Sequence, residues 1–119
     1  EYMLDESIHS PVDAARACRL EAADILNIKL MKCGGLTGGK INAVAEANHV
    51  QCMVGCMLET KVAIAAGVAL VAAKSNITEA DCDSFMFSGD DDGIAGGFDR
   101  KGGIFTLLDK PGLGIDMDI

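Results

Sequence analysis

The chain carries two short motifs that decide how its fold is interpreted, Asp5-Glu6-Ser7 and Ile28-Lys29-Leu30-Met31-Lys32-Cys33-Gly34-Gly35. Each motif closes a short apolar run that is typical of a buried strand, and a stretch with helical character follows each one. Asp5 and Lys29 are therefore placed at the carboxyl ends of two strands. In a parallel α/β barrel that edge of the sheet carries the chemistry. A carboxylate and a lysine on neighbouring strand ends can hold a divalent metal and remove a proton beside it.

Strands and helices continue to alternate along the chain. We expect strands that end at Asp5 and that cover residues 24–31, 50–54 and 82–87, the last introduced by Asp81. We expect helices over residues 11–23, after a Ser10 cap, over 40–48, after a glycine-rich turn at 34–39, and over 60–74. Four strand–helix units, the last with a weak or missing helix, form either a small doubly wound sheet or half of an eight-stranded (β/α)8 barrel.

The first strand favours the half barrel. We expect this strand to be clipped, because residue 1 lies only four positions before the acid at the strand end. A complete barrel takes about 250 residues, and this chain has 119. After Gly96-Gly97 the pattern becomes extended and turn-rich. We therefore expect residues 1–97 to form barrel strands five to eight and residues 98–119 to form an extended C-terminal tail.

The composition excludes several classes of partner. The net charge of -8 leaves no basic footprint for nucleic acid and disfavours an anionic membrane surface. The longest apolar run, residues 62–73, is shorter than the roughly 20 residues that span a bilayer. The five cysteines lack a CxxC pair, which favours reduced thiols in a cytoplasmic protein over zinc binding or disulfides.

Four motifs together resemble the C-terminal half of enolase-superfamily enzymes. They are Asp5-Glu6-Ser7, the Lys29 motif, Gly55-Cys56-Met57-Leu58-Glu59-Thr60 and Asp81-Cys82-Asp83, in the order and spacing of that superfamily. The resemblance covers nearly the whole chain. It is closest to the muconate lactonizing enzyme subgroup, and within that subgroup to the dipeptide (L-Ala-D/L-Glu) epimerases.

The resemblance implies a role for individual residues. Asp5 matches a carboxylate that binds Mg²⁺, and Lys29 matches a lysine that acts as acid and base. The residues that would contact the substrate are Cys56, Met57, Asp81 and Asp83, the two aspartates holding a free ammonium group. The implied reaction is that of an isomerase, a racemase or epimerase that removes the proton beside a carboxylate through an enediolate intermediate. The expected substrate is a small carboxylate, a dipeptide.

The resemblance also implies that this chain supplies only part of a site. The family uses a second lysine and two further carboxylates on earlier strands, and this sequence has no match for them. We therefore expect the isolated chain to be inactive. Two alternatives are a muconate-type cycloisomerase and an inactive half-barrel module that self-associates as a homo-oligomer, because a half barrel leaves open sheet edges.

Simpler interpretations of the same residues stay open. Asp5 is also compatible with an acid that satisfies amides at a helix start. The pair Asp81 and Asp83 is compatible with a solvated strand start. Lys32 is expected to be a surface charge or a residue that supports the site, and Glu59 either binds substrate or caps the following helix.

A nucleotide-binding loop is a further alternative. Residues 34–41 satisfy the pattern G-x-x-x-x-G-K after a strand. The complete motif then needs Ser or Thr, whose hydroxyl binds Mg²⁺. This chain has Ile41 at that position, which argues against the nucleotide site.

Overall fold

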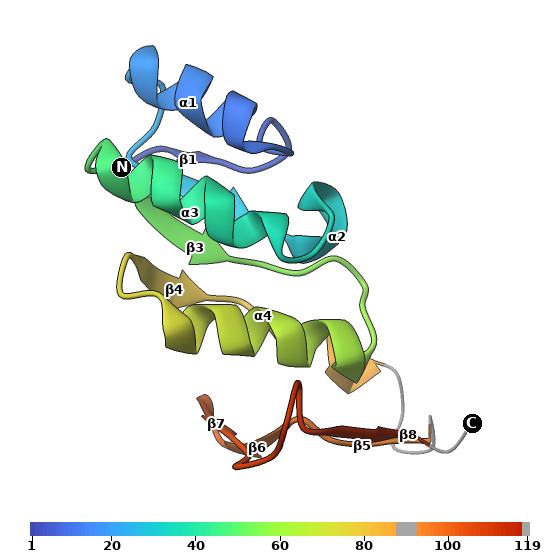
Figure 1. The fold of residues 1–119 in the computed structure, drawn as a ribbon. Coiled ribbons are helices and arrows are strands. Elements are labelled where there is room, and N and C mark those ends of the chain that lie inside the picture. Colours follow the sequence, from blue (N-terminus) through green and yellow to red (C-terminus); the bar gives the residue numbers. More distant parts are fainter. Residues whose placement is uncertain (88–92, 118–119) are drawn as a thin grey trace.

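The computed structural model describes residues 1–87 and 93–117 of the chain, and its centre is a parallel sheet of four strands (Figure 1). The strands are β1 (Met3–Leu4), β2 (Ile25–Ile28), β3 (Gln51–Val54) and β4 (Ile77–Ala80), in the spatial order β1-β2-β3-β4. Each strand lies beside its neighbour in the sequence, and every pair is parallel. In a doubly wound sheet the strand order changes direction at one point, so that helices cover both faces. Here the order runs in one direction throughout, and right-handed crossovers then bring all helices to one face, as in a barrel. The α/β prediction is therefore confirmed.

Four α-helices follow the strands in the described part of the chain. They are α1 (Pro11–Arg19), α2 (Leu30–Cys33), α3 (Thr37–Ala47) and α4 (Lys61–Ala73). The core lies between these helices and the sheet, where Leu26 and Ile28 of β2 meet Ile41 of α3 and Ile64 of α4, all at most 1% exposed. Alternate residues of a strand face opposite sides, so Asn27 and Lys29 face away from this layer.

The start of α1 follows the predicted cap. The Ser10 hydroxyl accepts a hydrogen bond from the Asp13 backbone N–H at 3.2 Å, and Pro11 occupies the first turn. The Asp13 carboxylate accepts hydrogen bonds from the Ser10 hydroxyl at 2.7 Å and from the His9 backbone N–H at 3.2 Å. The helix ends at Arg19 rather than at residue 23, because the chain turns at Glu21, which has φ +48°.

Two expected boundaries around the glycine-rich segment are wrong. Strand β2 ends at Ile28 rather than at residue 31, because residues 30–33 form the short helix α2. The turn is confined to residues 34–36, in which Gly34 and Gly35 have φ +78° and +72°. Helix α3 begins at Thr37 and includes two of the glycines. Gly38 lies so close to the sheet that a Cβ there would be 2.9 Å from Ile28 and Leu30 side-chain atoms.

The fourth strand also differs from its prediction. It covers Ile77–Ala80, whereas Ser84–Phe87 form a 3-10 helix, η1. The apolar residues of 82–87 are used in another way: the Phe85 ring packs on Phe98 and Phe105, with ring centroids 5.2 and 6.2 Å apart. A cluster with the C-terminal segment therefore replaces the expected strand packing.

The C-terminal residues form two antiparallel pairs. Strand β5 (Ile94–Gly96) pairs with β8 (Ile115–Met117), and β6 (Phe98–Lys101) pairs with β7 (Ile104–Leu107). Residues 93–117 contain strands and turns and no helix, as the extended pattern predicts. The division of the chain at residue 97 stays a prediction. No helix in the described part of the chain is long and apolar enough to cross a membrane.

Candidate functional site

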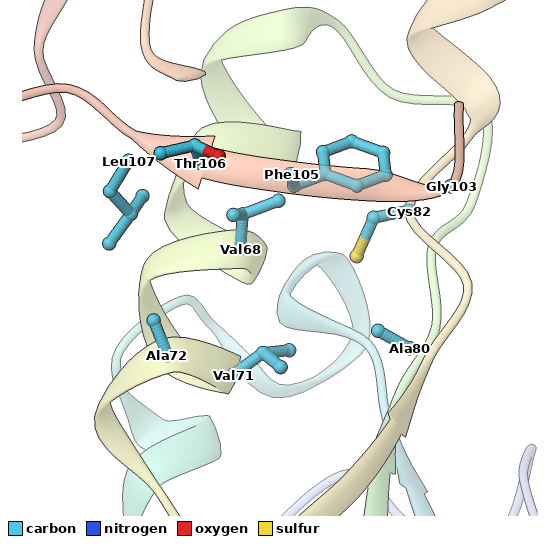
Figure 2. Close-up of a pocket in the computed structure, with 9 residues that line it drawn as sticks. All are labelled: Val68, Val71, Ala72, Ala80, Cys82, Gly103, Phe105, Thr106 and Leu107. Atoms are coloured by element: carbon cyan, nitrogen blue, oxygen red, sulfur yellow. The ribbon is translucent and has the colours of Figure 1, made fainter. Parts of the chain in front are cut away.

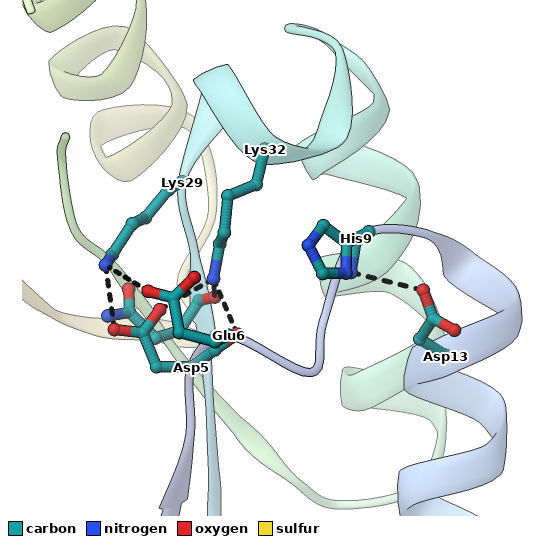
Figure 3. Close-up of polar contacts among 7 residues, drawn as sticks. Asp5, Glu6, His9, Asp13, Lys29 and Lys32 are labelled. Atoms are coloured by element: carbon teal, nitrogen blue, oxygen red, sulfur yellow. Dashed lines mark hydrogen bonds and ion pairs between the residues drawn. The ribbon is translucent and has the colours of Figure 1, made fainter.

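The carboxyl edge of the sheet brings the two principal predicted residues into contact. Asp5 follows β1 directly and Lys29 follows β2 directly, and these strands are parallel neighbours. Lys29 Nζ lies 2.8 Å from Asp5 Oδ2 and 3.2 Å from Glu6 Oε1 (Figure 3). The Lys29 side chain is only 12% exposed, whereas that of Asp5 is 36% exposed. An acid and a lysine thus share one partly open position at this edge.

A third residue, Lys32, joins this pair. Its Nζ donates hydrogen bonds to Asp5 Oδ1 and to the Asp5 main-chain oxygen, both at 2.6 Å (Figure 3). This contact was not predicted, because the expected strand ran to residue 31 and left no helical turn to carry Lys32 back to Asp5. The signal was present: two lysines three residues apart before Gly34-Gly35 indicate one helical turn that ends at glycine.

The electrostatics of this cluster favour the charged forms of its members. Burial alone would raise the pKa of Asp5, but hydrogen bonds and charges from Lys29 and Lys32 outweigh it and lower that pKa. The hydrogen bond from Lys29 to Asp5 raises the pKa of Lys29, with Glu6 adding to the effect. Lys29 is therefore an ammonium group while this contact lasts, and the contact must open before Lys29 can accept a proton.

A second cluster lies at the ends of β3 and β4. The Cys56 thiol and the carboxylates of Asp81 and Asp83 lie within 4.8 Å of one another. The expectation that both aspartates start a strand is wrong, because they follow the end of β4. Burial raises the pKa of Asp81, and the Asp83 carboxylate beside it adds to that rise. A cation placed between these groups would relieve their repulsion.

The remaining residue predicted to contact substrate, Met57, lies next to Cys56 in the loop after β3. Its side chain is exposed. The roles predicted for Met57 and for the Cys56 cluster stay predictions.

Glu59 is a buried acid in the same loop. It is 5% exposed, and its Oε1 has no hydrogen-bond partner among the described residues. Its backbone N–H donates to Ser84 Oγ at 3.1 Å, which fixes the loop. Burial raises its pKa, partly offset by the backbone N–H groups of Met57 and Met31 and by the charge of Lys29. Helix α4 has no side-chain cap, so the capping role considered for Glu59 is not observed.

Asn27 is buried on the same face of β2 as Lys29. Its Oδ1 has no hydrogen-bond partner within residues 1–87 and 93–117. A Cβ on Gly55 would lie 2.7 Å from this oxygen. Glycine at position 55 therefore lets the end of β3 pass close to the Asn27 amide.

A cavity of about 490 Å³ lies elsewhere, between α4 and the β6–β7 hairpin (Figure 2). Its lining is mostly apolar and includes Val68 and Val71 of α4, Cys82 and Phe105. Neither Asp5 nor Lys29 lines it. The charged edge and this apolar cavity are thus separate features.

Comparison with known proteins agrees with this geometry. A family model described as enolase C-terminal domain-like matches residues 2–119. The chain is 48% identical over 115 residues to L-Ala-D/L-Glu epimerase from Clostridium acetobutylicum, covering 96% of this chain and 32% of that protein. It is 46% identical over 114 residues to L-Ala-D/L-Glu epimerase from Bacillus subtilis, covering 95% of this chain and 31% of that protein.

Solved structures match as well. The substrate-liganded complex of the Bacillus subtilis L-Ala-D/L-Glu epimerase aligns with a TM-score of 0.90 at 45% identity, over 95% of this chain and 32% of that one. The dipeptide epimerase from Methylococcus capsulatus, complexed with Mg and the dipeptide L-Arg-D-Lys, aligns with a TM-score of 0.88 at 36% identity, over 95% and 32%. The chain spans about a third of the length of these relatives. It belongs to the enolase C-terminal domain-like family and corresponds to the C-terminal barrel part of enolase-superfamily structures.

Proposed function

We propose that the chain is the C-terminal barrel segment of a metal-dependent dipeptide epimerase, an isomerase that inverts a carbon next to a carboxylate. The observation that carries this proposal is the contact of 2.8 Å between Lys29 Nζ and Asp5 Oδ2 at the carboxyl edge of the sheet. The relatives named L-Ala-D/L-Glu epimerase support the reaction class, at 46–48% identity.

The Asp5 carboxylate is suited to bind Mg²⁺. Its carboxylate supplies hard oxygen atoms, which Mg²⁺ prefers, and the lowered pKa keeps it ionised. A bound Mg²⁺ would supply positive charge that makes the proton beside a substrate carboxylate more acidic. Lys29 Nζ would then remove or return that proton at the α-carbon.

Asp81 and Asp83 would hold the free ammonium group of the dipeptide, with Cys56 beside them. Two carboxylates within 4.8 Å of each other gain stability when a cation lies between them. Cycloisomerisation of muconate offers no such cation. This cluster therefore favours the dipeptide over the muconate-type alternative.

We propose that the isolated chain is inactive. Asp5 supplies only one carboxylate, which is too few ligands to bind Mg²⁺ tightly, and inversion of the carbon needs a second proton-transfer group besides Lys29. The test is a chimera in which residues 2–119 replace the matching third of the Bacillus subtilis relative. We expect this chimera, with Mg²⁺, to exchange the α-proton of L-Ala-L-Glu in D₂O and to leave a muconate lactone unchanged. The 119-residue chain alone should do neither.

Two outcomes would overturn this function. One is a folded chimera that exchanges no α-proton of any dipeptide tested, and the other is turnover of the muconate lactone in preference to L-Ala-L-Glu. Robust epimerisation by the isolated chain would overturn its proposed inactivity alone.

Self-association and a cytoplasmic location remain predictions. The order of the sheet leaves β1 and β4 at its two edges, and unpaired strand edges favour association with another chain. Light scattering on the 119-residue chain tests this point, and a monodisperse monomer would contradict it.

A further inference from the structure

We propose that Lys32 is a positioning residue that holds Asp5 so that only Oδ2 is available to Lys29 and to a cation. This inference rests on the proposed function, since it concerns the same site. It adds a residue to which the family resemblance gave no role.

Lys32 joins the ends of two strands through a single ammonium group. Its Nζ lies 2.6 Å from Asp5 Oδ1, 2.6 Å from the Asp5 main-chain oxygen and 3.5 Å from the Asn27 main-chain oxygen. An ammonium group has three donors, and here all three have acceptors. Because one acceptor is main chain and one is side chain of the same aspartate, Lys32 fixes both the backbone and the carboxylate of Asp5.

Burial of this group requires a specific reason. The Lys32 side chain is 6% exposed, and a buried ammonium is costly unless it is fully paired. Neutralisation of Asp5 does not supply that reason, because Lys29 already contacts the same carboxylate at 2.8 Å. A second lysine therefore contributes orientation: each carboxylate oxygen has its own partner, Oδ1 with Lys32 and Oδ2 with Lys29.

The two lysines are not equivalent. Lys32 is the more deeply buried of the two and is anchored to main-chain oxygens, whereas Lys29 is bonded to side chains, one of which, that of Glu6, is 69% exposed. A cation that approaches Asp5 from the open side therefore competes with Lys29 for Oδ2 and leaves Lys32 in place. Asp5 would then offer one oxygen to the cation, and Lys32 would keep the other.

The experiment compares three variants of the chimera. Lys32→Met removes the bonds while keeping most of the apolar stem, and Lys32→Gln keeps an N–H donor without charge. Lys110→Met is the matched control, because Lys110 pairs with Asp116 on the surface at 2.7 Å. The readouts are the Mg²⁺ dissociation constant without substrate, measured by calorimetry, kcat and KM for L-Ala-L-Glu, and the circular dichroism spectrum.

We expect Lys32→Met to weaken Mg²⁺ binding by about 10- to 100-fold, the usual effect of removing a group that orients a ligand. The kcat should fall while KM for the dipeptide changes little. Lys32→Gln should lie between Lys32→Met and the unmodified chimera, and Lys110→Met should match the unmodified chimera.

Unchanged or tighter Mg²⁺ binding in a folded Lys32→Met or Lys32→Gln variant would overturn the proposal, since it would mean that Lys32 only repels the cation or only supports the fold. If Lys32→Met does not fold, the Mg²⁺ affinity of Lys32→Gln decides the question. Failure of the function itself is distinguishable, because it appears as inactivity of the unmodified chimera, whereas this inference is judged on metal affinity.

Discussion

Lys29 Nζ lies 2.8 Å from Asp5 Oδ2, a contact that bridges residues 24 positions apart across two parallel strand ends. We predict that Lys29→Met in the chimera lowers the rate of α-proton exchange by about 10²- to 10⁴-fold, the usual contribution of a positioned acid or base. Lys29→Arg should not restore the rate, because a guanidinium group does not give up its proton in proteins. The rate is measured by loss of the α-proton signal of L-Ala-L-Glu in D₂O.

Lys40→Met is the control for this prediction. Lys40 is exposed on α3, so its loss should leave the exchange rate unchanged. Retention of most of the activity by Lys29→Met would contradict the assigned role.

The same contact predicts how stability depends on pH. The pKa of Asp5 is lowered in the folded chain, so its contribution is fully present above the unfolded value of about 3.8 and is lost as pH falls through the folded value. Asp5→Asn should therefore lower the thermal midpoint of the 119-residue chain at pH 6, and the difference should shrink toward pH 2. A difference that is constant over this range would show that the ionised carboxylate contributes nothing.

Lys29 gives the opposite dependence. Its pKa is raised by the bond to Asp5, so its contribution is present below the unfolded value of 10.5 and is lost as pH rises through the folded value. Asp116→Asn serves as the surface control at both acid and alkaline pH, because exposed ion pairs such as Lys110–Asp116 contribute little to the stability of the fold.

The sequence allowed those parts of the fold to be predicted that depend on local signals. The Ser10 cap and the apolar run of residues 62–73 located two helices, and the charged residues after apolar runs located the functional edge. The fourth strand could not be placed in this way. The apolar segment 82–87, which was predicted to be this strand, instead packs with the C-terminal segment through Phe85 and Phe98. That long-range contact has no local signature in the sequence.

The site shows the same division. The positions of Asp5 and Lys29 followed from the strand ends that their motifs mark, but the place of Lys32 depended on whether residue 30 belongs to a strand or to a helix. Local propensity does not decide a boundary at that precision. The position of Asp81 near Cys56 likewise depends on the true end of β4 at Ala80.

Two neighbouring glycines of α3 predict opposite effects on stability. A Cβ at Gly38 would be 2.9 Å from side-chain atoms of Ile28 and Leu30 and 3.1 Å from Leu70. Gly38→Ala should therefore destabilise the chain by about 1–3 kcal/mol, the usual cost of overpacking. At Gly39 the nearest atom would be 3.8 Å away, so Gly39→Ala should stabilise it by about 0.5–1 kcal/mol through helix propensity.

Urea unfolding of the two glycine variants and the unmodified chain measures both effects. Because both substitutions are the same chemical change in the same helix, each controls for the other. Equal shifts in the same direction would mean that α3 does not pack on β2 at Gly38 as described.

Glu59 predicts a gain of stability when its charge is removed. Burial raises its pKa in the folded chain, so its ionised form costs stability, and this cost appears as pH rises above the unfolded value of about 4.5. Glu59→Gln keeps an oxygen that can accept from the N–H groups of Met57 and Met31 while removing the charge. We expect it to raise the thermal midpoint at pH 7, with the advantage shrinking as pH falls toward 4.

Glu79→Gln is the matched control, because Glu79 is exposed on β4 and its replacement should leave the thermal midpoint at pH 7 unchanged. A thermal midpoint of Glu59→Gln that is lower than that of the unmodified chain at pH 7 would mean that the attraction of Glu59 to Lys29 outweighs its burial. Since burial is the larger of these two influences on its pKa, the structure favours the gain. A gain in stability accompanied by slower proton exchange in the chimera would show that the buried charge is kept for the reaction at the expense of the fold.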